Sequence, residues 1–257
     1  MGIVNVTPDS FSDGGRYFDP AAAVDHGLRL VAEGADILDI GGQSTRPRSA
    51  PVGLDEELRR VLPVVTALCR QTPAPVSIDT YQAAVAREAI AAGAEIINDI
   101  SGLTADPEMV EVARQSGCAV CIMHMLGTPQ TMQDAPQYQD VVGEVAEYLA
   151  RRRDALESAG IEASRIALDP GIGFGKNLDH NLQLLKAAGR FHALGCPLVF
   201  GPSRKRFIGE LVGDLKADRT AGTIGAVLAL ARQGVQVIRV HDVAGVSQAW
   251  RVYQATS

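Results

Sequence analysis

Short apolar runs recur along this chain, and each is followed by a polar loop and a stretch whose apolar residues repeat with helical spacing. The runs lie at 3–5, 37–40, 76–78, 96–98, 119–123, 166–168, 198–200 and 237–240. Strands that alternate with helices indicate a parallel sheet, and eight such units are the number that closes a (β/α)8 barrel of the TIM type. We expect residues 1–257 to form one α/β domain, because no low-complexity linker interrupts the chain.

Residues that favour helix ends mark the intervening segments. Asp19 and Asp106 each precede a proline, which is the pattern of an N-cap followed by a helix-compatible first residue. Glycines that suit a left-handed C-cap follow four of the helical stretches, at Gly34, Gly93, Gly117 and Gly160. A longer helix is expected over about 140–159, and the i,i+4 pair of Glu147 and Arg151 indicates a solvated face on it.

Composition narrows the class of protein. The chain is 46% hydrophobic and 21% charged, as is usual for a soluble globular protein. No apolar run approaches the ~18 residues that span a bilayer, and the start lacks a basic and apolar leader, so we expect neither a membrane protein nor a secreted one. The net charge of −6 argues against a general nucleic-acid surface and leaves local basic sites open.

Cys118 and Cys121 form a C-x-x-C motif, which also occurs in redox and zinc sites. The motif lies in an apolar run that is expected to be a strand, where residues three apart point to opposite faces. No second motif of this kind completes a zinc site. We therefore interpret these cysteines as core thiols and expect a cytoplasmic protein.

Polar residues stand at nearly every expected strand end, which is the edge that carries catalytic groups in this fold. In chain order they are Asn5, Asp39, Asp79, Asn98, His124, Asp169, Lys205, Arg239 and His241. The acidic and amide members Asp79, Asn98 and Asp169 suit a planar nitrogen-rich heterocycle, because a carboxylate accepts two parallel N–H bonds. A second group indicates a phosphate or diphosphate; it comprises Arg46, Arg204, Lys205, Arg239 and His241.

Each of these residues also has a structural interpretation. Asp79, taken alone, is more often a cap or a loop-holding group, and we interpret Asp39 and Asp99 as structural for that reason. His124 is about equally suited to a ligand role and to a buried core position. The stretch 169–176 resembles a phosphate loop, but Asn177 stands where such a loop has Ser or Thr, and its glycines suit a tight turn beside a ligand.

Longer motifs run through the chain in a fixed order. They are GIVNVTPDSFSDGG (2–15), GGQSTRP (41–47), VSIDT (76–80), IINDI (96–100), CIMHM (121–125), LDPGIGFGKN (168–177), SRK (203–205) and RVHD (239–242). Together they resemble the motifs of the dihydropteroate synthases over nearly the whole chain. The resemblance implies condensation of 6-hydroxymethyl-7,8-dihydropterin diphosphate with para-aminobenzoate, a step in folate biosynthesis that sulfonamides inhibit. It also implies Mg2+ as cofactor and a homodimer.

The family's roles fall on the matching positions of this sequence. The pterin ring would be held by Asp79, Asn98, Asp169 and Lys205, with Ile100 and Met123 as apolar lining. The diphosphate would be bound by Asn5, Thr45, Arg46, Arg239 and His241, and Asn5 would also coordinate Mg2+. The para-aminobenzoate pocket would be formed by Phe11, Pro47, Phe174 and Ser203, the last at a helix N-terminus. Catalysis would depend on Asp79, Lys205, Arg46 and Asp13, the last two on mobile loops.

Two other functions are compatible with parts of this sequence. A methyltransferase that acts on methyltetrahydrofolate and a corrinoid shares the pterin-binding acids but needs no diphosphate clamp. A non-catalytic relative would only bind pterin. The presence of Phe11, Arg46, Lys205 and Arg239 favours the synthase.

The chain departs from the family pattern in few places. Gln43 stands where the family more often has Glu, and Gly201 and Pro202 precede the SRK motif where other residues are common. Met1 falls inside the first expected strand, where relatives carry a short extra segment, so we expect a less covered barrel floor.

Overall fold

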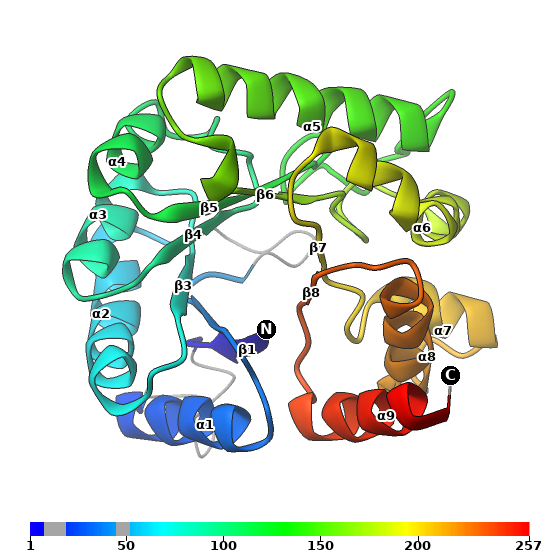
Figure 1. The fold of residues 1–257 in the computed structure, drawn as a ribbon, viewed down its shortest axis with the longest axis horizontal. Helices are drawn as coiled ribbons and strands as arrows, with labels where there is room; N and C mark the ends of the chain where they lie inside the picture. Colours follow the sequence, from blue (N-terminus) through cyan, green and yellow to red (C-terminus); the bar gives the residue numbers. More distant parts are fainter. Residues whose placement is uncertain (8–18, 45–51, 257) are drawn as a thin grey trace.

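The computed structural model describes residues 1–7, 19–44 and 52–256. Eight parallel strands lie at its centre (Figure 1). They are β1 (Gly2–Asn5), β2 (Leu38–Gly41), β3 (Val76–Asp79), β4 (Ile96–Asp99), β5 (Ala119–Met123), β6 (Ile166–Asp169), β7 (Val199–Phe200) and β8 (Val237–Ile238). Each expected apolar run therefore forms a strand, and the last two strands are shorter than the sequence pattern indicates.

The strands follow one another in chain order around a circle. Strands β1 to β6 form one sheet, and β7 pairs with β8 through Val199↔Val237. Single parallel bridges join this pair to both edges of the larger sheet, at Leu168↔Leu198 and Gly2↔Val240. The fold is thus the expected (β/α)8 barrel, whose seam on either side of β7 and β8 has less regular pairing.

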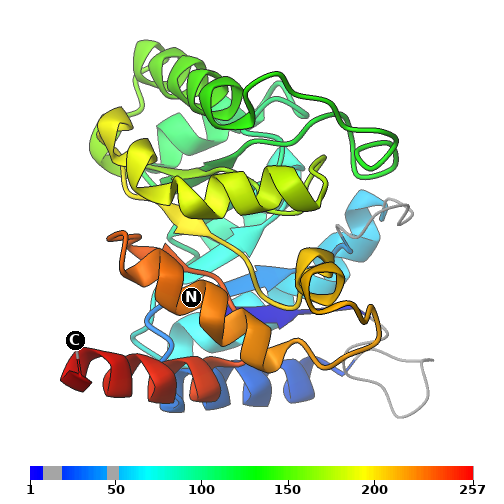
Figure 2. The ribbon, with the colours of Figure 1, turned by 90° about the vertical axis from the view of Figure 1, so that its right-hand side faces the viewer.

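Helices surround the barrel on its outer side (Figure 1). They are α1 (Pro20–Ala32), α2 (Leu54–Gln71), α3 (Ala83–Ala91), α4 (Met109–Ser116), α5 (Val141–Ser158), α6 (Leu178–Lys186), α7 (Arg206–Val212), α8 (Thr220–Ala231) and α9 (Val243–Thr256), with 3-10 turns at Ala163–Arg165 and Ala188–Leu194. Helix α8, which precedes β8, packs side by side with α9, which follows β8 (Figure 2). None of the described helices is both long and apolar enough to cross a membrane.

Strand alternation separates two environments. Residues such as Ile40, Ile78 and Ile122 point outward and join one hydrophobic cluster between the sheet and the helices. Their neighbours along the strands point into the barrel, where polar side chains are buried among small ones. Ser77, for example, lies two residues before Asp79 on the same strand face, which leaves room for the carboxylate above it.

The expected helix ends are confirmed with one exception. The Asp19 carboxylate caps α1, and all four glycines adopt positive φ after their helices. Asp106, however, does not begin α4, which starts at Met109 after Glu108. The Asp106 carboxylate accepts from the backbone N–H of Glu108 at 3.0 Å, in the turn just ahead of α4. Its other oxygen accepts from the backbone N–H of Ala83 at 2.8 Å and so also caps α3, whose own N-cap residue provides no side-chain bond.

The C-x-x-C cysteines lie on opposite faces of β5, as expected. Cys118 belongs to the outer hydrophobic cluster, whereas Cys121 lies outside it. Both are buried free thiols, and burial raises the pKa of Cys121 well above its ordinary value. The Cys121 thiol therefore stays protonated, and the burial of both side chains agrees with their interpretation as core residues.

Candidate active site

An arginine with two carboxylate partners lies at the centre of the barrel mouth. Arg239, just after β8, donates from Nε to Asp39 at 2.5 Å and from Nη2 to Asp79 at 2.7 Å. The Asp39 side chain is fully buried, while Arg239 and Asp79 keep 21% and 12% of their side-chain surfaces exposed. These ion pairs therefore link β2, β3 and the end of β8, and the Arg239 and Asp79 side chains remain partly exposed to solvent.

The electrostatics of this group are dominated by burial. Loss of hydration raises the pKa of Asp79 to about 7, since Arg239 offsets that effect only in part and the Asp39 carboxylate adds to it. Burial opposes the charge on Arg239 as well, but Asp39 and Asp79 outweigh it and raise the pKa of the guanidinium. Arg239 therefore stays cationic, and a cationic ligand would stabilise the ionised form of Asp79.

Three side chains each use one polar atom inside the protein and leave another available. Asp79 binds Arg239 through Oδ2, and Asn98 donates from Nδ2 to Asp39 at 3.1 Å. Asp169 accepts from the backbone N–H of Gly171 through Oδ1 at 2.7 Å. Within the described part of the chain no donor binds Asp79 Oδ1, Asn98 Oδ1 or Asp169 Oδ2. The three strands thus present three acceptors, which suits a ligand edge made of N–H groups.

Lys205 is a second buried cation of the mouth, near Arg239. Its ammonium donates to the backbone oxygen of Ile172 and sits 4.5 Å from the centre of the Phe174 ring. Burial lowers the pKa of Lys205 to about 8, and the nearby Asp169 carboxylate limits the decrease. The lysine is therefore mainly cationic at neutral pH and is tied to the loop that follows β6.

The same loop is also held by a buried lysine, Lys176. In the sequence this residue was noted only as part of the stretch 169–176 that resembles a phosphate loop. Lys176 is 3% exposed, and its Nζ lies 3.0 Å from His124 Nδ1 and 2.9 Å from the backbone oxygen of Phe174. Burial, with the charge of Lys176, lowers the pKa of His124 to about 3. His124 is thus a neutral buried histidine, in line with the core interpretation.

Ser203 and His241 form a pair at the seam of the barrel. Ser203 Oγ lies 2.9 Å from His241 Nδ1 and accepts from the His241 backbone N–H at 3.1 Å. The N-cap of α7 is Lys205, so Ser203 lies two residues before the N-cap rather than at the helix N-terminus. This differs from the sequence-based expectation, because the SRK motif forms a turn before the helix begins.

The remaining expected residues fall into two groups. Ile100 and Met123 are 5% and 3% exposed and lie outside the hydrophobic cluster that underlies the helices, in agreement with a place toward the barrel interior. Five other expected residues lie outside the described part of the chain, so their positions stay predictions: Phe11, Asp13, Thr45, Arg46 and Pro47.

Asn5 has the chemistry for a weakly held magnesium ion. It ends β1 opposite Gly41, and no hydrogen bond occupies its side chain among the described residues. An amide oxygen is a hard donor of the kind Mg2+ accepts. Since no group of three or more acidic, His or Cys side chains forms a metal cage in the described ranges, such an ion would take most of its ligands from phosphate and water.

Comparison with known proteins agrees with this geometry. A family model described as pterin binding enzyme matches residues 1–241. The chain is 46% identical over 256 residues to the dihydropteroate synthase of Escherichia coli strain K12, covering 100% of this chain and 90% of that protein. It is 44% identical to the dihydropteroate synthase of Synechocystis, covering 99% and 89% of the two chains.

Solved structures give the same result. The Yersinia pestis dihydropteroate synthase with a sulfonamide drug complex superposes with a TM-score of 0.94 at 44% identity, over 100% of this chain and 93% of that one. The Xanthomonas albilineans enzyme with 4-aminobenzoic acid gives 0.92 at 50% identity, over 99% and 91%. Its complex with 7,8-dihydropteroate gives 0.89 at 47% identity, over 99% and 92%. From its full-length similarity in sequence and in fold, this chain belongs to the pterin-binding enzymes and, among them, to the dihydropteroate synthase family.

Proposed function

We propose that this chain joins 6-hydroxymethyl-7,8-dihydropterin diphosphate to para-aminobenzoate and releases pyrophosphate, with 7,8-dihydropteroate as the product. One observation carries the proposal: three unused acceptors on β3, β4 and β6 lie beside two buried cations, Arg239 and Lys205. A dihydropterin has N–H groups along one edge and acceptors along the other. The pocket therefore matches the ring and its charged leaving group together.

Asp79, Asn98 and Asp169 accept hydrogen bonds from the N–H edge of the pterin in this proposal. Lys205 donates to the ring's oxygen and nitrogen acceptors, and Ile100 and Met123 line the ring. A charge-assisted hydrogen bond of this kind contributes ~1.5–3 kcal/mol, so each charged residue is expected to matter for affinity. As positive charge develops on the ring, it favours ionised Asp79, whose pKa near 7 makes it responsive to such a ligand.

The diphosphate lies toward Asn5, Arg239 and His241, and Thr45 and Arg46 are expected as further ligands of its oxygens. Asn5 would help to hold Mg2+, and the ion would supply electrostatic stabilisation of the leaving group. Arg239 acts in the same way and requires no rearrangement, because Asp39 and Asp79 already fix its guanidinium.

The chemical step proceeds by early departure of the leaving group. The bond between the pterin methylene carbon and the diphosphate oxygen breaks first, and both electrons leave with pyrophosphate. The ring delocalises the resulting cation, with Asp79 nearby to stabilise it. The neutral arylamine nitrogen then forms a bond to the methylene carbon and loses its proton to solvent. An arylamine is largely unprotonated at neutral pH, so the step requires no dedicated base.

Para-aminobenzoate occupies the side of the mouth near Phe174 and Ser203. Phe11, Pro47, Asp13 and Arg46 are further residues expected to act on it, and their positions stay predictions. The position of Phe174 beside the Lys205 ammonium supports this arrangement, since it places an aromatic wall next to the pterin side. We expect sulfonamides to compete for this pocket, as the drug complex of the Yersinia pestis relative suggests.

The methyltransferase and the non-catalytic relative are less well supported. A corrinoid methyltransferase has no use for cations at the leaving-group position, yet Arg239 lies there within a costly buried ion-pair group. A binding-only protein has no need of Lys205 as a charged group held in place over Phe174.

We also propose a cytoplasmic homodimer in which residues 1–257 act as one domain. Helix α8 contains no charged residue, and with α9 it forms an exposed groove of about 490 Å3 lined by Ile224, Leu228, Val252 and Tyr253, among others. Val252 is 61% exposed. A second copy of this chain would cover these apolar groups. Sedimentation of Val252→Glu as a monomer, beside a dimeric wild type, would support this surface; a dimer in the variant would exclude it.

The proposed reaction is tested by pyrophosphate release from the purified protein given the pterin diphosphate and Mg2+, with and without para-aminobenzoate. We expect release that depends on para-aminobenzoate and is lost in Lys205→Ala. Lys216→Ala, at an exposed position, is the control and should behave as wild type. Pterin binding without release in the wild type would favour the binding-only relative, and release that ignores para-aminobenzoate would refute the condensation.

A further inference from the structure

The turn that carries Ser203 and Lys205 has a strained residue at its centre. Arg204 has a φ of +56°, and only Leu103 and Ala135 share a positive φ among the described non-glycine residues. The left-handed conformation costs a residue with a Cβ about 1–2 kcal/mol. Such a conformation persists where surrounding contacts hold it.

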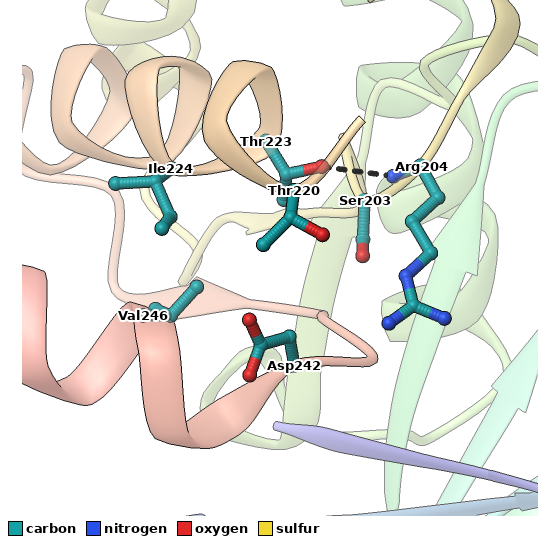
Figure 3. A pocket seen from close by; sticks show the side chains of 7 residues that line it. All are labelled: Ser203, Arg204, Thr220, Thr223, Ile224, Asp242 and Val246. Carbon is teal, nitrogen blue, oxygen red and sulfur yellow. Dashed lines mark hydrogen bonds between the residues drawn. The ribbon is translucent and has the colours of Figure 1, made fainter. Parts of the chain in front are cut away.

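Those contacts come from the first turn of α8. The Arg204 backbone N–H donates to Thr223 Oγ1 at 3.0 Å, and the same hydroxyl donates to the Arg219 backbone oxygen at 2.7 Å. Arg219 in turn donates from Nη1 to the Arg204 backbone oxygen at 2.9 Å. The backbone N–H and the backbone oxygen of Arg204 are therefore both bound by residues at the start of α8. Figure 3 shows the Thr223 side chain directed at the turn.

Thr223 is suited to this role. It is 3% exposed, and its β-branched side chain has restricted χ1 freedom, so the hydroxyl is fixed in place. A hydroxyl accepts and donates at the same time, which allows it to link Arg204 with Arg219. No neighbouring side chain in the close-up points at the Arg204 backbone in the same way, since Thr220 and Asp242 lie apart from it (Figure 3).

The conformation of Arg204 sets the directions of its two neighbours. Ser203 meets His241 on one side, and Lys205 reaches Ile172 and Phe174 on the other. A change of Arg204 to an ordinary helical or extended φ would turn these side chains away from their present partners. The turn therefore decides where two of the proposed substrate-binding residues lie.

We propose that Thr223 and Arg219 are positioning residues, which act on the reaction by holding Arg204 in its left-handed conformation and thereby aiming Lys205 and Ser203. This inference rests on the proposed function for its effect on catalysis. The contacts of Thr223 and Arg219 with the Arg204 backbone, here called the clamp, are hydrogen bonds of the structure and do not depend on that function. Neither residue contacts substrate in this scheme.

The test uses the full-length protein with Thr223→Val, which keeps the β-branched shape and removes the hydroxyl. We expect the pterin dissociation constant from calorimetry to rise, and kcat/KM for pyrophosphate release to fall, by at least tenfold. Thr223→Ser retains the hydroxyl and should keep most of the wild-type pterin affinity and most of the wild-type kcat/KM. Ser158→Ala is the control, because it removes a hydroxyl bonded to the carbonyl four residues earlier, as in Thr223, on a helix remote from the turn.

A second measurement does not depend on activity. The exchange rate of the Arg204 amide hydrogen, followed by NMR, should increase in Thr223→Val and stay at the wild-type value in Thr223→Ser and Ser158→Ala. If Thr223→Val does not fold, Arg219→Gln provides the same test through the Arg204 carbonyl. Wild-type affinity, turnover and exchange in a folded Thr223→Val would overturn the inference. Absence of turnover in the wild type would refute the proposed function instead. The exchange rates would still show whether Thr223 holds the Arg204 backbone.

Discussion

Gly171 is a position where an added methyl group meets backbone rather than a movable side chain. A Cβ there would lie 2.0 Å from the His124 carbonyl oxygen, and the residue has a φ of +71°. Gly117 has nearly the same φ, +73°, but a Cβ there meets nothing within 4 Å. Comparing Gly171→Ala with Gly117→Ala therefore separates the steric effect from the cost of the left-handed backbone.

Both variants are expected to lose the backbone contribution of about 1–2 kcal/mol. In Gly171→Ala the loop must also move by about 1.4 Å to reach an ordinary contact of 3.4 Å with His124. That movement breaks the bond from Gly171 N–H to Asp169 and weakens the attachment of Lys205 to Ile172. With ~1–3 kcal/mol for each bond to a charged group, Gly171→Ala should lose roughly 2–4 kcal/mol more than Gly117→Ala.

The assay is urea unfolding followed by circular dichroism, with pterin affinity measured by calorimetry on the same samples. We expect the larger loss of unfolding free energy, and a loss of pterin affinity, only in Gly171→Ala. Equal losses in the two variants, to within ~0.5 kcal/mol, would show that the loop relaxes freely and that the contact with His124 does not fix it.

Further predictions concern the buried charges. Arg239→Met leaves Asp39 and Asp79 without their cation and should lower the unfolding free energy by about 3–5 kcal/mol at pH 8. The loss should be smaller at pH 5, where Asp79, with its raised pKa, is protonated. Arg206→Met, in an exposed pair with Glu210, should cost below ~1 kcal/mol in the same urea titration. Because the pKa of Asp79 is raised to about 7, the folded state binds an extra proton, so the stability from protonated Asp79 is present below pH ~4 and lost as the pH rises through about 7. The stability difference between wild type and Asp79→Asn should therefore change across this range, and a constant difference from pH 4 to 8 would contradict the raised pKa; the comparison cancels Asp99, whose pKa burial raises to about 6. Lys176→Met removes the donor from His124 and from the Phe174 carbonyl and should lower the thermal midpoint clearly, whereas Lys216→Met at an exposed position should not.

Much of the fold follows from sequence because its signals are local. Apolar runs of strand length and glycines after helices depend on a few neighbouring residues, and these elements lie where the pattern placed them. The site residues at strand ends follow from the same alternation, since a parallel barrel brings all those ends to one edge. Among the expected positions that the structure describes, Asp79, Asn98, Asp169 and Arg239 lie near one another there.

The interactions between distant segments could not be obtained in this way. Asp39 was interpreted as structural, and it is the residue that fixes Arg239 from 200 positions away. Asp106 also caps α3, a helix that begins 23 positions before it. Lys176 gave no sign of burial, because a lysine beside glycines in a loop is ordinarily exposed. In each case the partner is set by tertiary packing, which a local pattern does not contain.

The closure of the barrel has a consequence for how the protein is made. Strand β1 is completed by a bridge from Gly2 to Val240, near the end of the chain. At ~5–20 residues per second, a ribosome takes roughly 12–48 s to reach that point, and until then β1 is an unpaired edge of an incomplete sheet. Open edges of this kind can pair with other chains. Substitutions that leave the finished enzyme unaffected but slow the arrival of β7 and β8 should therefore reduce the yield of folded protein in cells.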